Sequence, residues 1–131
     1  MTQVAQYLIK NYYTRYTKVK APAMKTLVKL CFERKDRMVI IQDDRIKGVA
    51  IYLTLTDETY RMLKDIDIAN ADAQMAFDLF RERGKNIHFI MLAADCLRTI
   101  LKGVREVVKR EHPRTVSWFN PDHTKLHTRR F

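Results

Sequence analysis

The chain has 131 residues, a length that predicts a single domain with a core that needs no metal or disulfide. Hydrophobic residues make up 47% of the chain, which excludes intrinsic disorder, and the absence of a long apolar run excludes a helical membrane span. The net charge of +10 favours a polyanionic partner: nucleic acid, an acidic protein or a phosphorylated cofactor.

The N-terminal sequence has no signal-peptide pattern, so a soluble cytoplasmic protein is expected. Cys31 and Cys96 are too few and too far apart for a metal or redox motif, which predicts two reduced thiols. The basic excess is uneven, because no acidic residue precedes Glu33 and the segment from Asp65 to Asp95 is net acidic.

Two helices are expected before the first strand. Thr2 to about Tyr16 can form a tyrosine-rich helix, and Pro22 suits the first turn of a second one. Two β-branched runs follow, Met38–Gln42 and Ile46–Thr56, separated by a short polar turn. These runs predict an antiparallel hairpin.

A helical region is expected between this hairpin and the next strand. Thr56 offers a capping hydroxyl, and Asp57 and Glu58 place acids in the first turn of a helix. Asp65 to Arg83 is also predicted to be helical, with Gly84 ending that helix.

The next segment reads as a strand, a helix and a second strand. Ile87–Leu92 is a nearly continuous apolar run, typical of a strand covered on both faces. Asp95 is the expected N-cap of the helix 96–111, whose spacing predicts the buried set Leu97, Ile100, Leu101, Val104, Val107 and Val108. Thr115–Phe119 follows as a strand, and two strands joined through such a helix are normally parallel.

Ligands of such sheets bind beyond the carboxyl ends of the strands, where helix N-termini point. That rule places a candidate site around Ala93–Cys96 on one strand and Trp118–Asn120 on the other. One more short strand is expected near Lys125 to Arg129.

The sequence of this hairpin resembles that of a known family. Asp43-Asp44 at the turn and Gly48-Val49-Ala50 after it look like the second-to-third strand hairpin of the GNAT (general N-acetyltransferase) superfamily. The strand–helix–strand segment is similar to that family's central strand, cofactor helix and following strand. The resemblance covers roughly Met38 to Asn120. The helical insertion at Thr56 to Lys85 looks most like that of the toxin-activating lysine acyltransferases.

This resemblance implies an α+β fold of the α/β three-layer type: a GNAT-like mixed sheet with N-terminal helices, a β-hairpin, a helical insertion and a C-terminal β-α-β unit, in one domain over residues 1–131. It implies an acyltransferase that moves an acyl group to an amine by direct attack. The donor would be acetyl-CoA or another acyl thioester, including acyl carrier protein, and no metal is implied.

The resemblance also implies which residues hold the donor. Its pantetheine arm would pair with the backbone of Met91 to Ala94, and its phosphates would meet N–H groups at the helix start. The implied set is Met91, Leu92, Ala93, Ala94, Asp95, Cys96, Arg98, Trp118 and Asn120. The corresponding loop of the family is rich in glycine, whereas this one has none, and an N-capping Asp95 would compete with an anion.

Three residues are candidates for the chemistry: His88, Tyr52 and Cys96. His88 can serve as a general base or make a structural hydrogen bond within a strand. Cys96 at a helix N-terminus would have a lowered pKa and could act as a nucleophile. Tyr52 alternates with Thr54 and Thr56 on the strand face where an acceptor would lie, and a half-buried strand face explains this pattern equally well.

Two other functions remain open from the residues alone. One is a GNAT-shaped scaffold that binds a protein partner without catalysis. The other is a small nucleic-acid-binding module, since basic residues accompany Trp118, Phe119 and Phe131 as on stacking surfaces. His123 and His127 lack further ligands nearby, so no metal site is expected.

Overall fold

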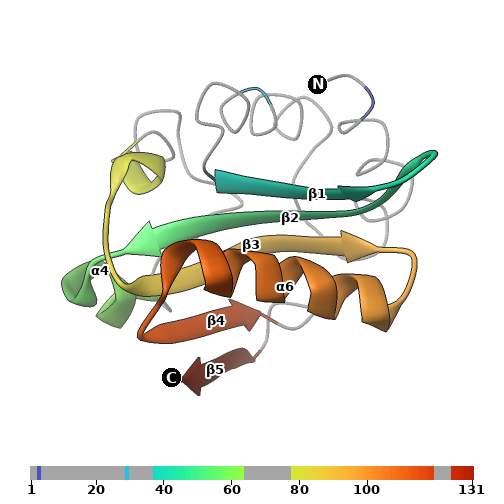
Figure 1. The fold of residues 1–131 in the computed structure, drawn as a ribbon. Helices are drawn as coiled ribbons and strands as arrows, with labels where there is room; N and C mark the ends of the chain where they lie inside the picture. The colour runs from blue at the N-terminus through green and yellow to red at the C-terminus, as the bar shows by residue number, and fades with distance from the viewer. Residues whose placement is uncertain (1–2, 4–28, 30–36, 64–77, 120–124) are drawn as a thin grey trace.

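The computed structural model describes residues 3, 29, 37–63, 78–119 and 125–131 (Figure 1). This part of the chain is a mixed α+β structure in which one long helix lies across a five-stranded sheet. The elements in chain order are β1 (Met38–Gln42), β2 (Ile46–Leu55), α4 (Asp57–Arg61), β3 (Asn86–Ala94), α6 (Leu97–Glu111), β4 (Thr115–Phe119) and β5 (Leu126–Arg130).

The strands lie in the order β1-β2-β3-β4-β5. The pairs β1–β2, β2–β3 and β4–β5 are antiparallel, and β3–β4 is parallel. The predicted hairpin is confirmed, and so is the parallel pair joined through α6. The last strand is also present, one residue later along the chain than predicted.

The core lies between α6 and the sheet. Its buried members are Val39, Ala50, Tyr52, Ile87, Phe89, Val107 and Val116. The helix packs across β1, β2 and β3. Two predicted core positions were wrong, because Leu97 is 70% exposed and Leu101 is 47% exposed. Both lie on the flank of α6, beyond the stripe that faces the sheet.

The start of α6 also differs from the prediction. Cys96, not Asp95, is the N-cap, and its side chain makes no capping hydrogen bond. The Asp95 N–H donates to the carbonyl of Lys47 at 2.9 Å, so its backbone bonds to β2 one residue beyond the end of β3. Its carboxylate instead pairs with Arg45 at 3.1 Å. The helix ends at His112, a non-glycine residue with φ of 48°.

The helical insertion is described only at its two ends. Thr56 caps α4 as predicted, accepting a hydrogen bond from the Thr59 N–H at 3.3 Å. The segments 1–2, 4–28, 30–36 and 64–77 lie outside the described residues, so the helices predicted there remain predictions.

Gly84 has a different role from the helix-ending one predicted for it. None of the described glycines has a positive φ, so no left-handed cap is formed there. A Cβ on Gly84 would instead overlap the backbone carbonyl of Leu55 and lie 2.5 Å from the Thr56 nitrogen. The glycine therefore lets the chain entering β3 cross the end of β2 in close contact.

Candidate functional site

The central strand β3 runs well past its parallel neighbour. Pairing between β3 and β4 ends at Phe89 and Trp118, whereas pairing with β2 continues to Ala94. Five further residues correspond to about 17 Å of extended strand. Within the described part of the chain, no strand pairs with the β4-facing edge of β3 over this stretch. Among the described residues, the strand edge from Ile90 to Ala94 is therefore open, and it is called the open edge below.

A β-bulge lies where this open edge begins. Ile51 pairs with Met91 and Tyr52 pairs with Phe89, which leaves Ile90 as an extra residue. Bulges of this kind bend a strand and increase its twist, which turns it away from a neighbour. The bulge therefore accounts for the separation of β3 from β4.

Backbone groups on the open edge can be assigned from the ladder. Because the Asp95 N–H points to Lys47 in β2, alternation directs the N–H and C=O groups of Ala94 and Leu92 to the other side. Two consecutive donor–acceptor pairs therefore face the gap beside β4. A ligand with amide groups could continue the sheet there.

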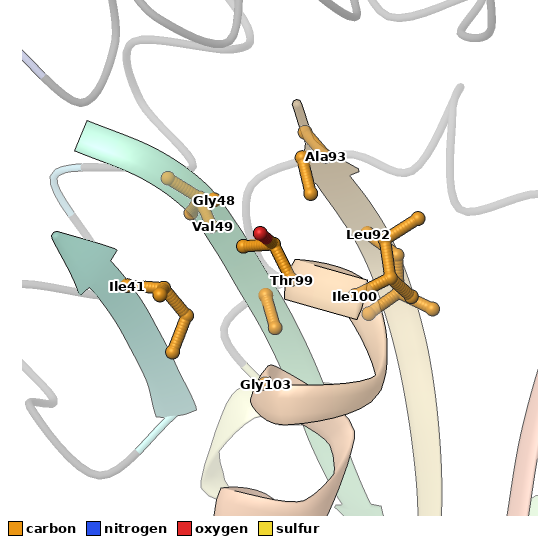
Figure 2. Close-up of a pocket in the computed structure, with 10 residues that line it drawn as sticks. Ile41, Gly48, Val49, Leu92, Ala93, Thr99, Ile100 and Gly103 are labelled. Carbon is orange, nitrogen blue, oxygen red and sulfur yellow. The ribbon is translucent and has the colours of Figure 1, made fainter. Parts of the chain in front are cut away.

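The open edge leads directly to the N-terminus of α6, which lies very close to the sheet. A Cβ on Gly48 would be 2.8 Å from the Cγ2 atom of Thr99, so a larger residue there would require the Thr99 side chain to shift. Figure 2 shows the side chains that line a small hollow between the sheet and the first turns of the helix. Its lining is Ile41, Gly48, Val49, Ala50, Leu92, Ala93, Ala94, Thr99, Ile100 and Gly103.

Charged side chains surround the helix start. Arg98 is exposed on the first turn of α6, and Arg45 approaches from the β1–β2 turn to meet Asp95. Lys47 pairs with Asp43 at 2.7 Å, which raises the pKa of the lysine. The pKa of Asp43 is lowered first by a hydrogen bond with Asp44 and second by the one with Lys47. The pairing with Arg45 directs the Asp95 carboxylate away from a capping role, so its predicted competition with an anion does not arise.

Cys96 is exposed at the start of α6. In the described part of the chain its thiol contacts the hydroxyl of Thr99 at 3.4 Å rather than an imidazole. Hydrogen bonds from the Thr99 side chain and backbone lower the thiol pKa below its usual value. Cys96 is therefore an exposed thiol with a lowered pKa, and no histidine of the described residues contacts it.

We expect the pH dependence of Cys96 alkylation by iodoacetamide to have its midpoint below the free-thiol value of about 8.5. Thr99→Val keeps the branched shape and removes the hydroxyl, so it should move that midpoint upward. Peptide mass spectrometry separates the modified Cys96 peptide from that of Cys31. An unchanged midpoint in the variant would contradict the assigned cause of the shift.

His88 is placed in the centre of the sheet, 1% exposed. It lies between Ile87 and Phe89, which belong to the core beneath α6, so its ring points to the opposite face. Its Nδ1 atom is 2.9 Å from the hydroxyl of Ser117 on β4. This buried pair lies two residues before Ile90, where the open edge begins, so His88 is a titratable side chain close to the opening of the two strands.

Of the two explanations given for the Tyr52 pattern, an acceptor-facing strand face and a half-buried one, burial of this residue favours the second. Its side chain is 0% exposed within the core, and its hydroxyl accepts a hydrogen bond from Arg110 at 3.5 Å. Burial raises the pKa of this tyrosine. Thr54 is also buried and donates to the Glu82 carbonyl at 2.7 Å, while Thr56 caps α4.

The other predicted donor-binding residues separate into two places. Leu92, Ala93 and Ala94 lie together at the end of β3, next to the start of α6. Trp118 pairs with Phe89 and so lies at the opposite end of the open edge, where it stacks on His127. The backbone of Met91 belongs to β3, and Asn120 lies outside the described residues.

Sequence reasoning missed the bulge, the Arg45–Asp95 pair and the Trp118–His127 stack. Each depends on contacts between distant segments, and the bulged residue Ile90 has no distinguishing composition. The sequence carried one usable signal, Gly48 in an otherwise β-branched strand, because an isolated glycine in a strand often marks close backbone approach.

Comparison with protein families, curated proteins and solved structures finds no match to this chain. The described residues contain no group of three His, Cys, Asp or Glu side chains arranged to hold a metal ion. They also contain no helix with the length and apolar character required to cross a membrane.

Proposed function

We propose that this chain is a divergent GNAT-like acyltransferase that moves an acyl group from a thioester donor to an amine. The observation that carries the proposal is the open edge from Ile90 to Ala94, which starts at a β-bulge and ends at the N-terminus of α6. The strand order, with one parallel pair joined through α6, supports the same proposal.

The donor would lie along this edge. The amide groups of a pantetheine arm would pair with the backbone of Leu92 and Ala94. Its phosphates would meet the N-terminal turn of α6 and the Arg98 side chain. The Asp95 N–H, already bonded to Lys47, takes no part.

The thioester carbonyl would then lie near the opening of β3 and β4. The acceptor amine attacks that carbon, the carbon–sulfur bond breaks, and the departing thiolate takes up the proton that the amine loses. His88, with its Nδ1 held by Ser117, is the candidate to relay this proton, directly or through water. Cys96 and Tyr52 have no role in this scheme.

Thermal unfolding of the full chain with a large excess of acetyl-CoA tests the proposal. A ligand at 100 times its dissociation constant stabilises a fold by about 2.7 kcal/mol, which raises the melting temperature of a chain of this size by roughly 5 to 15 °C. Acyl carrier protein loaded with an acyl group is the second probe. Failure of both donors to stabilise the protein would overturn the proposal.

The variant Ala94→Pro tests whether the donor binds along the open edge. Proline removes an N–H that pairs with no described strand, so the unliganded protein should remain folded. The stabilisation by the donor should be lost, whereas Ala94→Ser, which keeps the N–H, should retain it. Equal stabilisation of both variants would place the donor elsewhere.

A further inference from the structure

The far end of the sheet presents aromatic and basic side chains on one face. Val116 belongs to the core beneath α6, so its side chain is on the face of the sheet that α6 covers. Trp118 lies two residues further along the same strand, so its side chain is on the same face. His127 and Arg129 pair with Trp118 and Val116, so they lie on it as well. Figure 1 shows β4 and β5 at the end of the sheet, with β5 as its last strand.

Two ring contacts lie at this end of the sheet. The His127 ring stacks on Trp118 with centroids 5.5 Å apart and planes 14° from parallel. The Arg129 guanidinium lies 5.5 Å from the centre of the Phe131 ring, and Phe131 is 60% exposed. The Phe131 N–H bonds to the Arg114 carbonyl at 2.9 Å, which keeps this ring next to the strand.

The opposite face of β5 is used differently. Thr128 points there, and its hydroxyl lies 3.0 Å from that of Tyr60 in the α4 region. Side chains on β5 therefore divide into a set that contacts the body of the protein and a set that includes His127, Arg129 and Phe131.

Positive charge extends along the neighbouring helix. The exposed residues Arg98, Lys102, Arg105 and Lys109 recur at i, i+4, i+7 and i+11 on α6, which aligns them along its solvent side. Such a row attracts a phosphate backbone, and the flat rings on β4 and β5 supply stacking partners for bases.

We propose that this aromatic–basic surface, formed by Trp118, His127, Arg129 and Phe131, binds single-stranded nucleic acid. A single strand is favoured over a duplex because its bases have free faces that can stack on aromatic rings. An acidic protein would satisfy the charge but would leave the rings without a matching group. The observations behind this proposal lie on β4 and β5, whereas those behind the acyltransferase proposal lie on β3 and the start of α6.

Trp118 is the only tryptophan, so its fluorescence reports directly on this surface. We expect quenching when a 12-nucleotide oligo(dT) or oligo(U) is titrated into the full chain, with log affinity falling by about 0.7 per phosphate contact for each tenfold rise in salt. A duplex of equal length and polyglutamate should bind at least about tenfold more weakly. No quenching, or equal binding of duplex or polyglutamate, would overturn the proposal.

Arg129→Gln and Arg130→Gln form a matched pair. They remove the same charge from adjacent positions of one strand, but alternation directs them to opposite faces. The first should weaken binding about tenfold and the second only slightly. His127→Ala should act like the first, while His127→Phe, which keeps a ring, should bind like the wild type. Equal losses of affinity in the two arginine variants would mean that binding depends only on net charge, which would contradict the assigned surface.

Discussion

Replacing Gly84 with alanine is expected to destabilise the fold by about 3 kcal/mol or more. The new Cβ would overlap the Leu55 carbonyl, and every nearby atom is backbone of the last residues of β2 or of the cap of α4. A side chain could rotate away, but this backbone is held by the β2–β3 ladder. Chemical or thermal unfolding measures the loss, which corresponds to a fall in melting temperature of roughly 10 °C or more.

Gly103→Ala is the matched control. Its Cβ would lie 3.8 Å from that of Ala50 and 4.0 Å from the Ile41 Cγ1 atom, both ordinary contacts. Alanine in place of glycine inside a helix contributes about 1 kcal/mol, so this variant should be more stable than the wild type. Similar stability changes in the two variants would contradict the close approach assigned to Gly84.

The second large loss of stability is expected from replacing Asn86, which is 2% exposed at the start of β3. Its side-chain nitrogen donates to the Leu55 carbonyl at 3.1 Å and to the Asp57 carboxylate at 2.8 Å. Its oxygen accepts from the Thr115 hydroxyl at 2.8 Å. Asn86→Ala leaves buried polar groups without these partners, so we expect a loss of about 3 kcal/mol, measured by denaturant unfolding.

Thr115→Val removes one of the three bonds and should cost about 1 kcal/mol. The double variant should lose less than the sum of the single losses, because both changes remove the same bond. Additive losses would contradict the pairing.

The Asn86 amide also lowers the pKa of Asp57, with Arg114 as the second cause. A carboxylate whose pKa is lower in the folded state stabilises the protein above its unfolded pKa, and this contribution disappears as pH falls. Stability of the wild type should therefore decrease on acidification below about pH 4. Asn86→Ala should show a smaller decrease, since it removes the larger cause; an equal decrease would contradict that cause.

Most of the described elements could be predicted from local pattern. The alternation and β-branched content around residues 38–55 predicted the hairpin, and the helical spacing after Cys96 predicted α6 and the parallel strands it joins. Helix ends were predicted less well. Asp95 is a good capping residue by type, yet its N–H bonds to Lys47 of β2 and the helix cap falls on Cys96.

For the candidate site, the sequence predicted the location, at the carboxyl end of β3, but not the full set of residues that lie there. Ala93 and Ala94 were correctly grouped with the start of α6, but Trp118 was not, because the register of β3 against β4 places it beside Phe89. Register depends on pairing between strands that are distant in the chain, so no local pattern contains it. The local pattern around Tyr52 left an acceptor-facing and a half-buried strand face open, and its burial comes from α6 packing over β2.

The sequence by itself determined the kinds of element, the parallel β-α-β connection and the strong positive charge, because these follow from side-chain periodicity and composition. Tertiary structure decided where β3 separates from β4, which carboxylates pair with which arginines, and which aromatic rings meet on β5. These depend on strand register and on one bulged residue, Ile90, and they are fixed by the free energy of packing the whole sheet rather than by any short segment.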